Sequence, residues 1–128
     1  MVLFERIGGK QGLTALLRHF YADVRQHRVI GPIFNARIHD WRAHIDKVAE
    51  FWARQTGAPS LYPGGFVAAH LPLGLKPEHF GHWLDLWEFN CRRQLPATEA
   101  EEMITRARQI GAQLARIVEG RGGLHVGP

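Results

Sequence analysis

Apolar side chains recur along this chain at the spacing of an α-helix, and this periodicity limits the folds that the chain can adopt. In residues 13–24, LTALLRHFYADV, they occur at i, i+3, i+4, i+7, i+8 and i+11, which are Leu13, Leu16, Leu17, Phe20, Tyr21 and Val24. These positions share one face of a helix, so the stretch predicts an amphipathic helix. No stretch alternates convincingly between apolar and polar residues, as a half-buried strand would. The sequence therefore predicts an all-α protein.

A second long helix is predicted in residues 41–55, WRAHIDKVAEFWARQ, with Asp40 as its N-cap. This segment carries two adjacent apolar stripes. The first consists of Trp41, Ile45, Val48 and Trp52, and the second of His44, Val48, Phe51 and Gln55. A helix with two apolar faces packs between two neighbours, so we expect the protein core on one side and room for a ligand on the other.

Prolines and glycines delimit the rest of the chain. Pro77 is predicted to open a third long helix that Pro96 ends, and a fourth follows with Thr98 and Glu101 as a capping box and a stop at Gly120. Two short helices are predicted, one at Pro32 and one in FVAAHL, residues 66–71. The chain is thus expected to form a single domain over residues 1–120, with a disordered tail at 121–128.

Composition narrows the functional classes. The formal charge is +4 with a pI of about 9.8, which permits a nucleic-acid or acidic partner, but the basic residues are scattered and no run exceeds two. A solvated basic surface is the favoured interpretation. The single Cys91 excludes an internal disulfide and a cysteine-based zinc finger. With no signal-like N-terminus and no apolar run approaching the ~20 residues of a membrane span, a cytoplasmic location is expected.

Eight of the 128 residues are histidine, and two of these have the strongest claim to a function. His44 lies on the second apolar stripe of its helix. His70 lies in FVAAHL, which PGG precedes and PLG follows, and six residues do not form a stable helix alone. A bond from His70 to a metal would hold the segment in place. A short packed turn in which His70 hydrogen-bonds to a backbone carbonyl would do the same. His79 and His82 are offset by three residues beside an aromatic stripe, so we expect them at the rim of their helix.

These candidates have a common interpretation. A histidine on a short segment, facing a slot lined by aromatic side chains with a few polar groups opposite, has the outline of a haem pocket. His70 would be that histidine. Tyr21, His44, Phe80 and Trp83 would come from the helices around it.

Seven short motifs in order make the sequence resemble the truncated haemoglobins, and among them the group III pattern most. The motifs are FY..V at 20–24, GPIF at 31–34, W..H at 41–44, FW at 51–52, Y.G at 62–64, H..L at 70–73 and HF..WL at 79–84. The match covers about residues 4 to 118. The resemblance implies a two-over-two helical sandwich with four long helices plus short ones, and haem b as cofactor.

The resemblance also implies a role for each matched position. His70 matches the proximal iron ligand, and the distal side matches Tyr21, His44 and Trp83. Lys47 matches a position that often pairs with a haem propionate, and Val48 is apolar and can donate no hydrogen bond. The residues expected to line the haem are Phe34, Lys47, Val48, Phe51, Phe66 and Phe80.

Such a polar distal pocket suits a protein that holds O2 tightly and uses it, or that meets NO or another small diatomic. We expect redox chemistry such as nitric oxide dioxygenation or peroxide handling rather than O2 delivery, with no catalytic residue assigned. The chain carries no nucleotide or flavin motif, so a separate reductase is expected to supply electrons. Two alternatives stay open: a zinc or non-haem iron protein using His70, His79 and His82, and a basic all-α module that binds nucleic acid.

Overall fold

The computed structural model describes residues 1–59 and 76–126, with side chains as far as Ile117. These residues form helices and no strands, which confirms the predicted all-α class. The helices are α1 (Leu3–Arg6), α2 (Gly9–Gln26), α3 (Gly31–Arg37), α4 (Trp41–Gln55), α6 (Pro77–Gln94) and α7 (Ala97–Val126). No helix in this part of the chain is long and apolar enough to cross a membrane.

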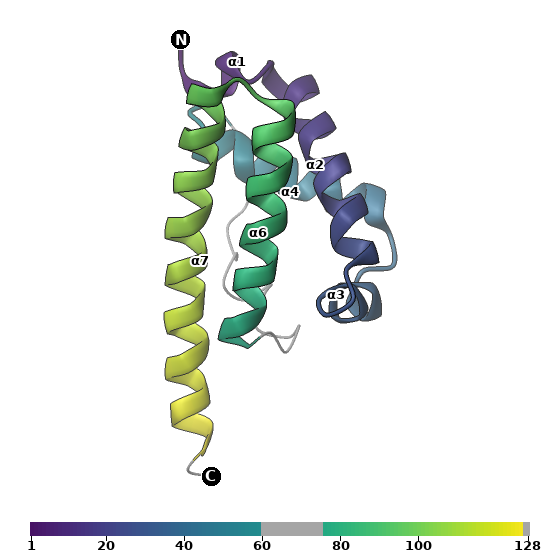
Figure 1. The fold of residues 1–128 in the computed structure, drawn as a ribbon, viewed down its shortest axis with the longest axis vertical. Coiled ribbons are helices and arrows are strands. Elements are labelled where there is room, and N and C mark those ends of the chain that lie inside the picture. Colours follow the sequence, from purple (N-terminus) through teal and green to yellow (C-terminus); the bar gives the residue numbers. More distant parts are fainter. Residues whose placement is uncertain (60–75, 127–128) are drawn as a thin grey trace.

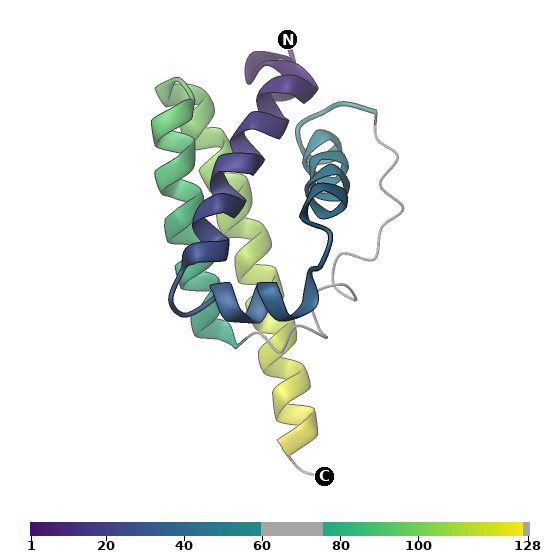
Figure 2. The same ribbon diagram turned by 90° about the vertical axis from the view of Figure 1, so that its right-hand side faces the viewer.

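The long helices form two packed pairs. α2 packs against α4, α6 packs against α7, and α2 also contacts α6, which joins the pairs. Figure 1 shows α6 and α7 side by side, with α4 passing behind α2. In Figure 2 α2 crosses between the α6–α7 pair and α4. This is the two-over-two arrangement that the resemblance implies.

The predicted apolar faces form the core. All six residues of the periodic stripe on α2 are buried, and Leu13, Leu17, Phe20 and Val24 are wholly inaccessible to solvent. On α7 the buried side chains include Met103, Ile104, Ala107 and Leu114. On α2 the periodicity therefore identified correctly which face turns inward.

The N-terminal segment adds structure that the periodicity did not predict. α1 is only four residues long and is held by tertiary contacts: the backbone N–H of Phe4 donates to the Thr56 carbonyl at 3.0 Å, and Arg6 Nη1 donates to Glu102 Oε2 at 2.6 Å. α2 then begins at Gly9, earlier than Leu13. Gly12 must be glycine, because a Cβ there would lie 2.1 Å from the Ile7 carbonyl oxygen.

Helix α4 has the bounds that the sequence predicted, and its cap is confirmed. Asp40 Oδ1 accepts a hydrogen bond from the Ala43 backbone N–H at 3.0 Å, which satisfies a donor that the first turn of a helix leaves unpaired. This cap places the first turn of α4, including His44, at a defined position beside α2.

The predicted ends of α7 are wrong at both termini. The helix begins at Ala97, and the Pro96 carbonyl accepts the Ala100 N–H at 2.9 Å, so Thr98 lies inside the first turn and does not cap it. α7 also continues through Gly120 to Val126. Glycine stops a helix where it turns to the left-handed conformation, and Gly120 remains helical. The domain boundary at residue 120 and the disorder of residues 121–128 stay predictions.

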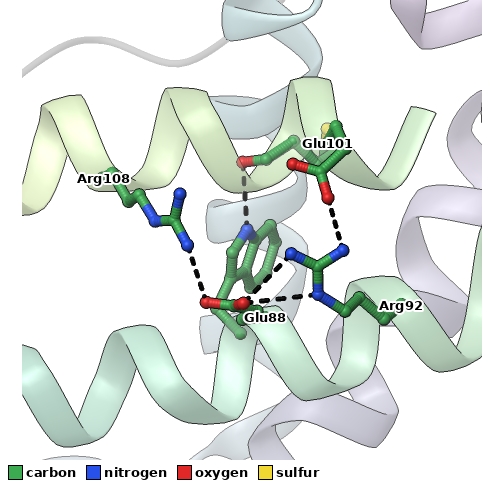
Figure 3. A network of polar contacts seen from close by, with 6 residues as sticks. Glu88, Arg92, Glu101 and Arg108 are labelled. Carbon is green, nitrogen blue, oxygen red and sulfur yellow. Dashed lines mark hydrogen bonds and ion pairs between the residues drawn. The ribbon is translucent and has the colours of Figure 1, made fainter. Parts of the chain in front are cut away.

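Four charged side chains link α6 to α7 (Figure 3). Glu88 Oε1 accepts from Arg92 Nη2 at 3.1 Å, and Glu88 Oε2 accepts from Arg108 Nη2 at 2.9 Å. Arg92 also pairs with Glu101. Glu101 thus pairs with Arg92, Arg92 with Glu88, and Glu88 with Arg108, and these ion pairs connect the two helices.

This network predicts that acid weakens the fold. Hydrogen bonds from Arg92, then from Arg108, lower the pKa of Glu88 below its ordinary 4.5. A carboxyl whose pKa is lower in the folded state stabilises it fully above the ordinary value, and the contribution is lost as the pH falls through the folded-state pKa. Urea unfolding at a series of pH values should show a smaller acid-induced fall in the midpoint for Glu88→Gln than for wild type. Equal falls would contradict a stabilising role for the network.

Candidate functional site

Three side chains from α2 and α4 form a closed aromatic triangle. The Tyr21 ring lies 5.2 Å from the His44 ring at an interplanar angle of 81°, and 5.6 Å from the Trp41 ring at 48°. The Trp41 and His44 rings lie 5.6 Å apart at 84°. Two of the three predicted distal residues are therefore in direct contact, although they are far apart in the sequence.

Burial determines the protonation of the Tyr21 hydroxyl. The side chain is 4% exposed, and burial raises the pKa of the phenol well above its ordinary value of 10.0. The hydroxyl therefore keeps its proton at neutral and moderately alkaline pH and can donate a hydrogen bond. The Nε2 atom of His44 is likewise shielded from solvent, so both polar groups lie in an environment in which electrostatic interactions are stronger than in water.

The third predicted distal residue, Trp83, comes from α6 and joins this cluster through Phe20. The Phe20 ring lies 4.9 Å from the Tyr21 ring and 5.4 Å from the Trp83 ring, edge-on to both. Trp83 in turn stacks on Trp87, at 5.8 Å and an angle of 3°. Phe20 and Trp87 are wholly buried, so they give Trp83 a rigid support. Tyr21 and Trp83 thus both contact Phe20, and His44 joins the cluster through its contact with Tyr21.

The predicted lining residues supply apolar surface on the neighbouring helices. Phe34 on α3, Phe51 on α4 and Phe80 on α6 are each less than 10% exposed, and Val48 is half-buried against the core. Lys47 is exposed on α4. A haem requires large apolar surfaces and a few polar groups, so these residues fit the group.

The chain was compared with known proteins. Residues 2–113 match the bacterial-like globin family. The chain is a bacterial-like globin. This globin is 29% identical over 125 residues to a group 3 truncated haemoglobin of Campylobacter jejuni, a match that covers 94% of this chain and 98% of that one. Membership of the family supports haem-based binding of small ligands, as the motifs predicted.

Solved structures agree with the family. A group III truncated haemoglobin from Campylobacter jejuni matches with a TM-score of 0.81 at 28% identity, over 86% of this chain and 91% of that one. A group II truncated haemoglobin from Bacillus anthracis matches with 0.78 at 27%, over 90% of each chain. A 2/2 haemoglobin from Synechococcus shares the fold, with 0.80 at 19%, over 91% of this chain and 99% of that one. The predicted two-over-two globin fold is confirmed.

Two predicted haem contacts lie outside the described residues. They are His70, the predicted iron ligand, and Phe66. The segment that carries them connects α4 to α6, which also carry His44 and Trp83. The roles of both residues stay predictions.

The other histidines of α6 have contacts of their own. His79 Nδ1 accepts the Lys76 backbone N–H at 2.9 Å and so caps the start of the helix. The His82 ring lies 5.0 Å from the His27 ring, and His27 Nδ1 accepts the N–H groups of Val29 and Ile30. Within residues 1–59 and 76–117, no three histidine, cysteine or acidic side chains are placed to hold a metal ion. His79 is thus a structural cap in this globin.

Sequence reasoning missed three residues that support the site. Phe20 and Trp41 were recognised as apolar stripe residues, but neither these two nor Trp87 were predicted to contact the distal candidates. A signal existed for Trp41, because it precedes His44 by three positions and residues three apart share a helix face. The contacts of Phe20 and Trp87 depend on how α2 packs against α6, which a single sequence does not reveal.

Proposed function

We propose that this globin binds haem b with His70 as the proximal iron ligand and with Tyr21, His44 and Trp83 on the distal side. The observation that carries the proposal is the convergence of these three side chains from α2, α4 and α6 on one buried aromatic cluster. The proposed lining of the haem is Phe34, Lys47, Val48, Phe51, Phe66 and Phe80.

The distal side chains would set how long a ligand stays. When bound, haem would supply a ferrous iron for O2, NO and similar diatomics, and O2 at that iron would offer a negatively charged acceptor. The Tyr21 hydroxyl, the His44 imidazole and the Trp83 indole can each donate a hydrogen bond to such an acceptor. A hydrogen bond to a charged group contributes ~1.5–3 kcal/mol, which corresponds to roughly ten- to a hundredfold slower release.

Slow release favours the use of O2 over its delivery. In nitric oxide dioxygenation, one NO, one O2 and one electron give one nitrate ion, so repeated turnover requires an electron donor. The sequence carries no nucleotide or flavin motif, and a separate reductase is therefore part of the proposal. The nitrate formed when NO is mixed with the oxygenated protein measures this activity, and a yield no higher than that of free haem would contradict it. Peroxide handling draws on the same pocket and the same donor.

Haem titration of the purified globin tests the cofactor. We expect an intense Soret band that saturates at one haem per chain. We expect no binding of nucleic acid at any salt concentration. A colourless protein that carries zinc instead would overturn the proposal in favour of the His70, His79 and His82 site. Nucleic-acid affinity that weakens steeply with salt, without haem uptake, would overturn it in favour of the basic binding module.

A further inference from the structure

We propose that Trp41 is a positioning residue that holds Tyr21 and His44 in their distal orientation, and that Arg25 closes over Trp41 from the solvent side. The inference rests on the proposed function, because it assigns Trp41 a role toward the same pocket. It assigns a role to Trp41, which the W..H motif contains without one, and to Arg25, which no motif contains.

The orientation of Trp41 follows from the first turn of α4. Trp41 opens the helix, Asp40 Oδ1 accepts the Ala43 N–H, and the Asp40 carbonyl accepts the His44 N–H at 3.0 Å. Trp41 and His44 therefore sit on one face of a capped turn, where their backbones cannot move independently. The Trp41 ring meets the His44 ring edge-on, at 84°, and the Tyr21 ring at 48°. Trp41 therefore limits the rotation of both rings.

Arg25 covers the outer face of Trp41. Its Cζ atom lies 4.9 Å from the centre of the Trp41 ring, a distance typical of a cation–π contact. The backbone of Arg25 is fixed as well: its carbonyl accepts Asn35 Nδ2 at 3.0 Å, and a Cβ on Gly31 would approach that carbonyl to 2.9 Å. The close approach of α3 to the end of α2 therefore fixes the backbone position from which the guanidinium reaches the indole.

These contacts form a continuous series, from Arg25 through Trp41 to Tyr21, that leads from solvent to the distal side chains. Arg25 is exposed, Trp41 is half-buried, and Tyr21 is buried. Because Tyr21 and His44 are in direct contact, a small ligand can pass between them only if one of the two rings rotates, and Trp41 opposes that rotation. If Trp41 is shortened, His44 and Tyr21 gain rotational freedom, so ligands should pass more easily and distal hydrogen bonds should become less uniform.

Carbon monoxide is a suitable probe, because its stretching frequency in the ferrous complex responds to nearby donors. We expect Trp41→Leu to split or broaden the C–O stretching band, because Tyr21 and His44 then adopt more than one orientation. The CO association rate should rise by about tenfold, which corresponds to a barrier lower by ~1.4 kcal/mol. Trp41→Phe keeps an aromatic ring and should restore a single band and most of the wild-type rate. A role limited to folding would change neither the band nor the rate in chains that retain haem.

A second pair of variants tests the outer contact without disturbing α4. Arg25→Leu should change the CO band and rate in the same direction as Trp41→Leu, by a smaller amount, and Arg25→Lys should restore them because a cation remains over the indole. Arg28→Leu, at an exposed arginine of the following turn, is the matched control and should behave as wild type.

The outcomes separate this inference from the proposed function. If the wild-type chain takes up no haem, the proposed function fails. If it takes up haem but Trp41→Leu keeps the wild-type CO band and rate, the inference is overturned and the proposed function stands. If Trp41→Leu does not retain haem, Arg25→Leu is the decisive variant. A changed CO band that Arg25→Lys restores supports the inference, and an unchanged band overturns it.

Discussion

Replacing His70 with glycine is expected to lower haem affinity by at least about a hundredfold, because removing even an outer-shell partner of a metal ligand costs ten- to a hundredfold. Haem titration measures the affinity. Free imidazole should enter the space left by the side chain and restore the Soret band, since it supplies the same donor atom. His39→Gly, at an exposed residue between α3 and α4, is the control and should keep wild-type affinity.

The contacts of the other histidines make this test specific. His79 uses Nδ1 to cap α6, and His44 packs against Tyr21 and Trp41 on the proposed distal side. Both side chains thus already have contacts with other described residues. Wild-type haem affinity in His70→Gly without imidazole would assign the iron to another residue and contradict the proposed site.

Removing single distal donors is expected to release oxygen faster. In Tyr21→Phe the hydroxyl is lost and the ring remains, and in Trp83→Phe the indole N–H is lost. Each donor removed should raise the O2 dissociation rate by roughly ten- to a hundredfold, which corresponds to one hydrogen bond of ~1.5–3 kcal/mol to a charged acceptor. Stopped-flow displacement of O2 by CO measures the rate.

Two comparisons sharpen this second test. Phe89→Leu changes an exposed aromatic residue on the same helix as Trp83 and should leave the rate unchanged. Because burial keeps Tyr21 protonated, the wild-type rate should not acquire a pH dependence from this phenol near neutral pH. If neither Tyr21→Phe nor Trp83→Phe releases oxygen faster than wild type, the distal side does not retain O2 in the proposed way.

Periodicity and capping were sufficient to predict the helices whose stability is local. α4 has the predicted bounds because Asp40 caps its first turn, and the stripe on α2 is buried as predicted. α1 was not predicted, because its four residues are held by Thr56 and by Glu102, which are distant in the sequence. The start of α7 was predicted too late, because Thr98 and Glu101 have the spacing of a capping box. The helix instead begins directly after Pro96, whose carbonyl accepts the Ala100 N–H.

The residues of the candidate site also differ in how far the sequence alone could identify them. Tyr21 and His44 could be selected from the sequence, because each lies on an apolar helix face and matches a family motif. Trp41 shares a helix face with His44, but its contacts with Tyr21 and Arg25 could not be predicted, because they depend on how α2 packs against α4. Helical spacing shows which residues share a face, but the partner of that face is determined by the packing of the whole chain.

A crystal structure of the haem-loaded globin with a distal ligand would test the proposed site in a single experiment. We expect His70 bonded to the iron on one side of the haem, with Tyr21, His44 and Trp83 facing the ligand on the other. A different residue on the iron, or a haem whose ligand contacts none of these three side chains, would contradict it.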